Sequence, residues 1–135
     1  MTLFSQVTGL PVEAAGGGGR LGEVRSLVVD VASGRVTHAR IRRGRLRRDA
    51  VVAWPDLRAT AHGLRAVRPT TDAPATPDLI GAEALTECGE EHGTVLDAEF
   101  DPLTGRLTTV LTTHGKVPAP HLLGLGNHAL IVEDV

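Results

Sequence analysis

The sequence predicts an all-β protein made of two small barrel-like repeats joined by a Pro-rich linker. Three observations lead to this prediction. Short apolar or β-branched runs alternate with turn signals along the 135 residues, one residue pattern occurs twice, and no segment carries a clear amphipathic helical stripe. About 60 residues of short strands bury little surface as an open sheet, so we expect each sheet to close and the two repeats to pack together.

The repeat is visible at a constant offset of 71 residues. Residues 21–36 read LGEVRSLVVDVASGRV and residues 92–107 read HGTVLDAEFDPLTGRL. The matched pairs are Gly22 and Gly93, Val24 and Val95, Asp30 and Asp101, Gly34 and Gly105, and Arg35 and Arg106. After a shorter loop in the second half, Leu57 is aligned with Leu122 and Val67 with Val132. The predicted domains are therefore residues 1–68 and 78–135, with a linker over 69–77.

Each repeat is expected to begin with a strand that leads into a hairpin turn. These strands cover residues 23–31 and 94–100, and their turns have Asp at the first position and Gly at the last, as type I turns favour. The next strands, over 35–41 and 106–113, lead to Gly-centred tips at Gly44 and Gly115. Shorter strands follow near 50–54 and 116–120, and again near 64–67 and 129–132, while 56–60 and 121–125 are candidates for single helical turns.

Composition restricts the classes of function. The charge of −2 divides into +7 over residues 1–68 (12 Arg, 5 acids) and −9 over 69–135 (2 bases, 11 acids). The single cysteine, Cys88, excludes an internal disulfide. We expect a cytoplasmic protein without a signal peptide or membrane span, and the abundance of Ala, Gly and Arg over Lys is typical of a high-GC bacterium.

The turn and core positions of both halves resemble the PRC-barrel family. This small β-barrel occurs in the photosynthetic reaction-centre H subunit and in a ribosome-maturation factor. The residues that resemble the family are Gly9, Val12, Leu21, Gly22, Val24, Asp30, Gly34, Arg35, Val36, Pro55 and Leu57 in the first half, and Gly81, Gly93, Val95, Asp101, Gly105 and Val132 in the second. The resemblance implies a barrel fold and a binding role, and it brings no catalytic residues.

Three constellations could carry chemistry, and a plain structural role is favoured for each. GGGRLG at 17–22 fits a dinucleotide fingerprint, but the residues after it read as a strand instead of a helix. Cys88 and His92, with His114, His121 or His128, match no standard zinc spacing. Asp97, Glu99 and Asp101 alternate along one strand and therefore share a solvated acidic face. We expect no catalytic residue, metal or cofactor.

The segment RIRRGRLRR at 40–48 is the main candidate for binding. A hairpin with its tip at Gly44 would place Arg40 and Arg42 on one face of the incoming strand. The other arginines of the segment are Arg43, Arg45, Arg47 and Arg48. Arginine pairs well with both carboxylates and phosphates. The slightly acidic chain, and the lack of a nearby aromatic side chain to stack on a base, favour carboxylates, with Asp97, Glu99 and Asp101 as candidate acids.

We therefore expect a non-catalytic protein-interaction or adaptor module of the PRC-barrel type. The carboxylates would come from the acidic second repeat of the same chain, from a second molecule that associates through the opposite charges of the two halves, or from another, acidic protein. The alternative is an RNA- or ribosome-assembly accessory factor that binds through the Arg-rich hairpin 40–48.

Overall fold

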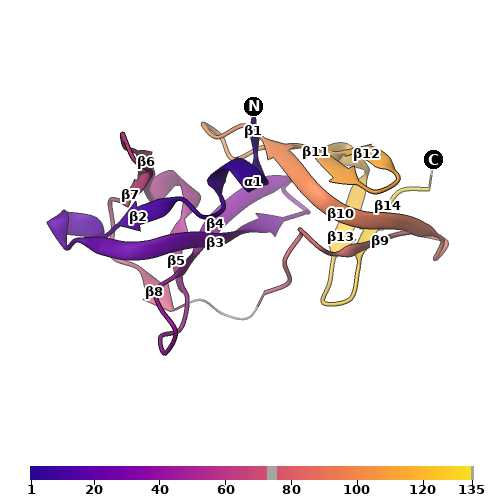
Figure 1. The fold of residues 1–135 in the computed structure, drawn as a ribbon. Helices are drawn as coiled ribbons and strands as arrows, with labels where there is room; N and C mark the ends of the chain where they lie inside the picture. The colour runs from indigo at the N-terminus through magenta and orange to yellow at the C-terminus, as the bar shows by residue number, and fades with distance from the viewer. Residues whose placement is uncertain (73–75, 135) are drawn as a thin grey trace.

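The prediction of an all-β chain is confirmed by the structure, a computed structural model that describes residues 1–72 and 76–134. Two curled sheets lie side by side, one formed by the first half of the chain and one by the second (Figure 1). Residues 73–75 of the predicted linker lie outside the described residues. Within the described part of the chain, no helix is long and apolar enough to cross a membrane.

The first sheet has the strand order β6-β7-β2-β3-β4-β5-β8. Neighbouring strands are antiparallel, except that β2 and β7 are parallel. The last strand, β8, comes from the segment predicted to be linker. The bounds are β2 (Pro11–Glu13), β3 (Arg20–Asp30), β4 (Arg35–Arg42), β5 (Ala50–Ala53), β6 (Leu57–Ala59), β7 (Leu64–Ala66) and β8 (Thr71–Asp72).

The second sheet has the order β13-β14-β9-β10-β11-β12, which is the order β6-β7-β2-β3-β4-β5 of the first sheet in corresponding strands. Its parallel pair, β9 with β14, corresponds to β2 with β7. The strand β1 (Thr2–Leu3) belongs to the first half of the chain but pairs with β10 of the second. The bounds are β9 (Glu83–Thr86), β10 (Glu91–Phe100), β11 (Leu107–Thr112), β12 (Gly115–Pro118), β13 (Leu122–Leu125) and β14 (Leu130–Val132).

The short helical elements are α1 (Phe4–Val7) and three 3₁₀ turns, η1 (Ala15–Gly17), η2 (Trp54–Asp56) and η3 (Ala119–His121). The prediction of helical turns over 56–60 and 121–125 was wrong by two residues, since those segments mostly form β6 and β13. Proline at the start of η2 and of η3 sets a helical φ there, and Leu57 and Leu122 then return to extended backbone.

The same backbone hydrogen bonds recur in the two halves. Gly9 N donates to Val24 O at 2.8 Å, and Gly81 N donates to Val95 O at 2.9 Å. The alignment of Val67 with Val132 was wrong by one residue, because Leu57 pairs with Ala66 where Leu122 pairs with Val132. The cause is a bulge in β13, where the register shifts between Leu122 and Gly124, so that β13 has one residue more than β6.

The junction between the halves contains the three aromatic residues of the chain. Phe100 of β10 lies edge-on to Phe4 of α1 and to Trp54 of η2, with ring centroids 5.3 Å apart in both pairs. Phe4 and Phe100 are almost fully buried in one core that continues through both sheets. The halves therefore share a hydrophobic core, which small β units need for stability.

The turns at 30–34 and 101–105 complete the junction by pairing with each other. Val36 N donates to Gly105 O at 2.7 Å, and Leu107 N donates to Gly34 O at 2.8 Å. These two bonds join corresponding residues in a reciprocal way, and Arg35 and Arg106 form the bridge between them. In a two-fold symmetric interface, each residue contacts the equivalent of its partner in the same way. Here the two halves of one chain form such an interface.

Candidate interaction surface

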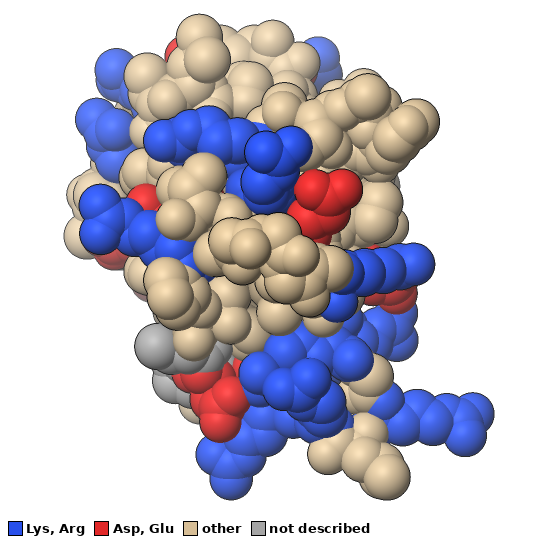
Figure 2. All heavy atoms as spheres, turned by 90° about the vertical axis from the view of Figure 1, so that its left-hand side faces the viewer, with Lys and Arg blue, Asp and Glu red and all other residues tan. Residues whose placement is uncertain are grey.

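The arginine segment forms the end of β4 and the loop that follows it. The predicted tip at Gly44 was wrong, because β4 and β5 pair Ile41 with Ala50 and so centre the loop between Arg45 and Leu46. The turn lies at Arg45 and Leu46, and Gly44 precedes it with φ of 140°. The loop projects below the first sheet in Figure 1, and Figure 2 shows Lys and Arg side chains gathered over the lower part of the face that it draws.

Arg40 is buried and serves the structure. Its guanidinium donates to Ser26 Oγ at 3.0 Å, to Asp78 Oδ1 at 2.7 Å and to Thr76. Only 9% of the side chain is exposed, and a buried guanidinium needs this many acceptors. Arg40 is therefore unavailable to a partner molecule, and its carboxylate comes from the acidic half of the same chain, which is one of the sources that the sequence left open.

Arg42 and Arg43 also form ion pairs within the chain. Arg42 Nη2 lies 2.8 Å from Glu23 Oε1. Arg43 Nη2 pairs with Asp72 of β8, and its Nε donates to the backbone oxygen of Arg48 at 2.8 Å. These contacts hold the base of the loop against the sheet. The Arg42 pair is exposed and contributes little stability, so a competing carboxylate can displace it, whereas the Arg43 side chain is only 12% exposed.

Arg45, Arg47 and Arg48 differ from the three preceding arginines in their contacts. Within residues 1–72 and 76–134, none of the three lies within salt-bridge distance of a carboxylate. Arg45 and Arg47 line a groove of about 680 Å³ between the loop and β3, and Leu46 between them is fully exposed. We call the loop 43–49 the basic loop. It presents three free cations around one apolar side chain.

The acids that were predicted as interaction residues lie elsewhere. Asp97 accepts hydrogen bonds from Ser5, and Glu99 accepts one from Thr108. Asp101 accepts from Leu103 N inside its own turn. Among the described residues none of the three acids forms an ion pair, so the structure does not bring them together with the basic loop.

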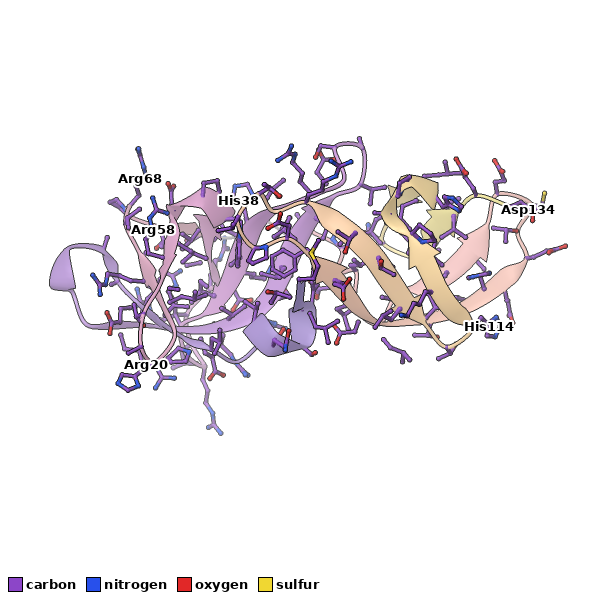
Figure 3. The ribbon with its side chains drawn as sticks, turned by 90° about the horizontal axis from the view of Figure 1, so that it is seen from above. Arg20, His38, Arg58, Arg68, His114 and Asp134 are labelled. Carbon is purple, nitrogen blue, oxygen red and sulfur yellow. The ribbon has the colours of Figure 1, made fainter. Side chains whose placement is uncertain are left out.

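A second acidic group, which was not predicted from the sequence, lies at the outer end of the second half of the chain. Figure 3 places Asp134 at one end, and Arg20, Arg58 and Arg68 at the other. The strand order brings the C-terminal segment beside the turn before β10, so acids distant in sequence gather there. We call this group the acidic end, and its exposed members are Glu87, Glu90, Glu91, Glu133 and Asp134.

Cys88 lies within the negative potential of the acidic end. Hydrogen bonding to Asp134 raises the pKa of its thiol, and the charge of the same carboxylate, slight burial and the charge of Glu87 add to the effect. Cys88 is exposed and free. The thiol is therefore neutral at pH 7 and is a weaker nucleophile than an isolated cysteine.

The remaining candidates from the sequence are the histidines and the glycine run. His92 and His114 lie near each other, with ring centroids 6.0 Å apart. Within the described residues no group of three or more His, Cys, Asp or Glu side chains converges as metal ligands would. The glycine run before β3 leads into a strand, so it provides no helix N-terminus for a phosphate.

Comparison with known proteins adds no family. No family model matches the chain, and no curated protein matches it either.

Proposed function

We propose that this chain is a non-catalytic interaction module of two PRC-barrel-like repeats, whose basic loop binds carboxylates on another protein molecule. One observation carries the proposal: Arg45, Arg47 and Arg48 are exposed without carboxylate partners in the described structure. The shared strand order and the recurring hydrogen bonds support the two repeats.

The exposed Leu46 favours a protein over RNA as the partner. Burial of a leucine surrounded by arginines fits a protein interface, which has an apolar centre and a polar rim. Single-stranded nucleic acid instead calls for aromatic side chains that stack on bases. The three aromatic residues of this chain lie together at the junction, away from the basic loop.

The partner that the chain itself offers is the acidic end of a second copy. The basic loop projects from the first half of the chain, below its sheet in Figure 1, whereas Figure 3 places Asp134 of the acidic end at the outer end of the second half, so the two are not neighbours within one chain. Between two copies they form a head-to-tail contact, which leaves one unused end on each copy and permits further growth. Bidentate arginine–carboxylate pairs would give this contact its specificity.

Two charge-neutralised variants test the proposal. One carries Arg45→Gln, Arg47→Gln and Arg48→Gln, and the other carries Glu87→Gln, Glu90→Gln and Glu91→Gln. Each has one disabled end, so we expect neither to self-associate alone, whereas their mixture forms a one-to-one heterodimer. The wild type should form larger species, and raising the salt from 0.1 M to 1 M should dissolve them as the Debye length falls from about 10 Å to about 3 Å.

Light scattering coupled to size-exclusion chromatography measures all four samples. A control variant with Arg106→Gln and Lys116→Gln removes positive charges outside the basic loop, and it should associate like the wild type. A monomeric wild type at 0.1 M salt would contradict head-to-tail association. If the wild type binds generic RNA with micromolar affinity and the triple arginine variant does not, RNA replaces protein as the partner.

A further inference from the structure

The junction between the two halves contains a groove. By the approximate two-fold symmetry of the halves, this groove lies in the second half where the Trp54 side chain lies in the first. It has a volume of about 690 Å³ and lies between the turn at 31–35 and the start of η3. We call it the Ala119 groove. Its lining includes Val31, Gly34, Arg35, Leu107, Ala119 and Leu122.

The correspondence follows from contacts described above. η2 and η3 both start after an extended residue, contain proline, and continue into Leu57 and Leu122, which begin corresponding strands. Trp54 is the first residue of η2, and Ala119 is the first residue of η3. A methyl group therefore stands in the second half where an indole stands in the first.

The indole of Trp54 shows what such a position holds. Its Nε1 donates to Pro102 O at 2.8 Å, and its ring lies edge-on to Phe100. A Cβ atom placed on Gly105 would lie 2.7 Å from Val36 O and 3.6 Å from Trp54 Cδ1, so the strand backbone and the ring together cover that turn glycine. Gly105 is buried.

The other side of the junction lacks this cover. Gly34 corresponds to Gly105, has a similar φ of 68° against 79°, and makes the reciprocal backbone bond. A Cβ atom placed on Gly34 would meet nothing within 4 Å, and Gly34 is only half-buried. The space that an indole fills on one side is thus open on the other.

The chemistry of the Ala119 groove suits an aromatic ring. Leu107 and Leu122 form a buried apolar floor. Arg35 and Arg106 line the same groove, and guanidinium groups favour the face of an indole. Val31 takes the place of Pro102, and its carbonyl oxygen, which accepts Gly34 N at 3.1 Å, has a second lone pair for an indole N–H.

We infer that the Ala119 groove binds an aromatic side chain, with tryptophan as its best fit, presented by a protein partner. The internal copy of the site supplies the model for the occupant: ring against the turn glycine, N–H on the carbonyl of the turn. Aromatic side chains that enter preformed pockets are common anchors of protein interfaces. The site is separate from the basic loop and does not depend on the function proposed for that loop.

N-acetyl-tryptophanamide is the probe, because it carries the side chain without charged termini. Titration into ¹⁵N-labelled protein should give saturable shifts of the amides of Gly34, Arg35 and Thr108. Ala119→Trp supplies the indole from within the chain and should weaken binding at least tenfold. N-acetyl-leucinamide should bind at least fivefold more weakly than the tryptophan probe.

The reciprocal variant gives a matched control. Trp54→Ala should open the equivalent position, raise the stoichiometry from one probe to two, and add shifts at Gly105 and Arg106. Ala119→Phe replaces Ala119→Trp if the latter does not fold. Absence of saturable shifts, equal binding of the leucine probe, or binding that survives the filling of the groove would overturn the inference.

A variant of the basic loop keeps the two proposals distinguishable. The protein with Arg45→Gln, Arg47→Gln and Arg48→Gln should bind the tryptophan probe with unchanged affinity, even though it no longer associates through that loop. Loss of probe binding in this variant would contradict a site at Ala119.

Discussion

For the ion pair between Arg40 and Asp78, we expect that removing the charge of the more exposed residue, Asp78, destabilises the protein more than replacing the buried Arg40. The Arg40 side chain is 9% exposed and the Asp78 side chain is 47% exposed. Asp78→Asn leaves a buried guanidinium without its counter-charge. Fully buried pairs lose about 3–5 kcal/mol when one partner is removed. Because Asp78 is half in water and Ser26 and Thr76 still accept hydrogen bonds, we expect a loss of about 1–3 kcal/mol.

Arg40→Met should cost less, at about 0–1.5 kcal/mol. Methionine fills much of the volume and brings no charge, while the remaining Asp78 carboxylate stays hydrated. Urea unfolding followed by the fluorescence of Trp54, the only tryptophan, measures both variants. Each 1 kcal/mol corresponds to a shift in Tm of roughly 3–6 °C for a chain of this size.

An ion pair with an exposed arginine provides the control for this comparison. Arg25 Nη1 lies 3.0 Å from Asp49 Oδ2, but 58% of the Arg25 side chain is exposed. Asp49→Asn should therefore change the free energy of unfolding by less than about 1 kcal/mol. A greater loss for Arg40→Met than for Asp78→Asn would refute the view that an uncompensated buried charge dominates at this site.

Two further predictions concern the backbone and the acidic end. Gly22→Ala should destabilise the protein by about 2 kcal/mol or more in the same urea assay, because the new Cβ atom would lie 2.0 Å from Arg42 O. Gly124→Ala, with nothing within 4 Å, should change stability by less than about 1 kcal/mol. Asp134→Asn removes the main cause of the raised pKa of Cys88, so the thiolate fraction near pH 8 increases and alkylation by iodoacetamide becomes faster.

The sign of the cysteine prediction follows from the thiolate being the reactive form. A raised pKa lowers the thiolate fraction at any pH below it, so Asp134→Asn accelerates alkylation there and leaves the rate unchanged once both thiols are fully ionised. In urea the two proteins should react alike. Equal rates in the folded proteins at pH 8 would exclude Asp134 as the cause.

For Gly22→Ala, a stability equal to that of wild type would show that β3 and β4 can separate without cost.

The local pattern of the fold could be read from the sequence, because turns and strands depend on neighbouring residues. Gly34 and Gly105 mark their turns through their positive φ, as the repeated DxxxG spacing predicts. The position of the loop tip failed, since it depends on the register of β4 against β5.

Contacts between the halves could not be read in the same way. Nothing near Trp54 in the sequence indicates Phe100 as its neighbour, and nothing near Arg40 indicates Asp78. Both contacts depend on how two sheets pack. The acidic end was missed for a related reason: Asp134 and Glu87 are far apart in the chain and meet only through the pairing of β9 with β14. The composition of the second half, with its 11 acids, held the only signal.

The pairing of β1 with β10 has a consequence for how the chain is made. Leu3 pairs with Glu99, so after Leu3 a ribosome adds 96 residues (99 − 3) until Glu99 itself is in place. At about 5–20 residues per second, synthesis takes roughly 5 to 20 s to supply the second strand. Throughout that interval Phe4 has no Phe100 to pack against. The first sheet therefore emerges with part of its apolar surface open, and slowing translation between the two halves should prolong its exposure to chaperones and proteases.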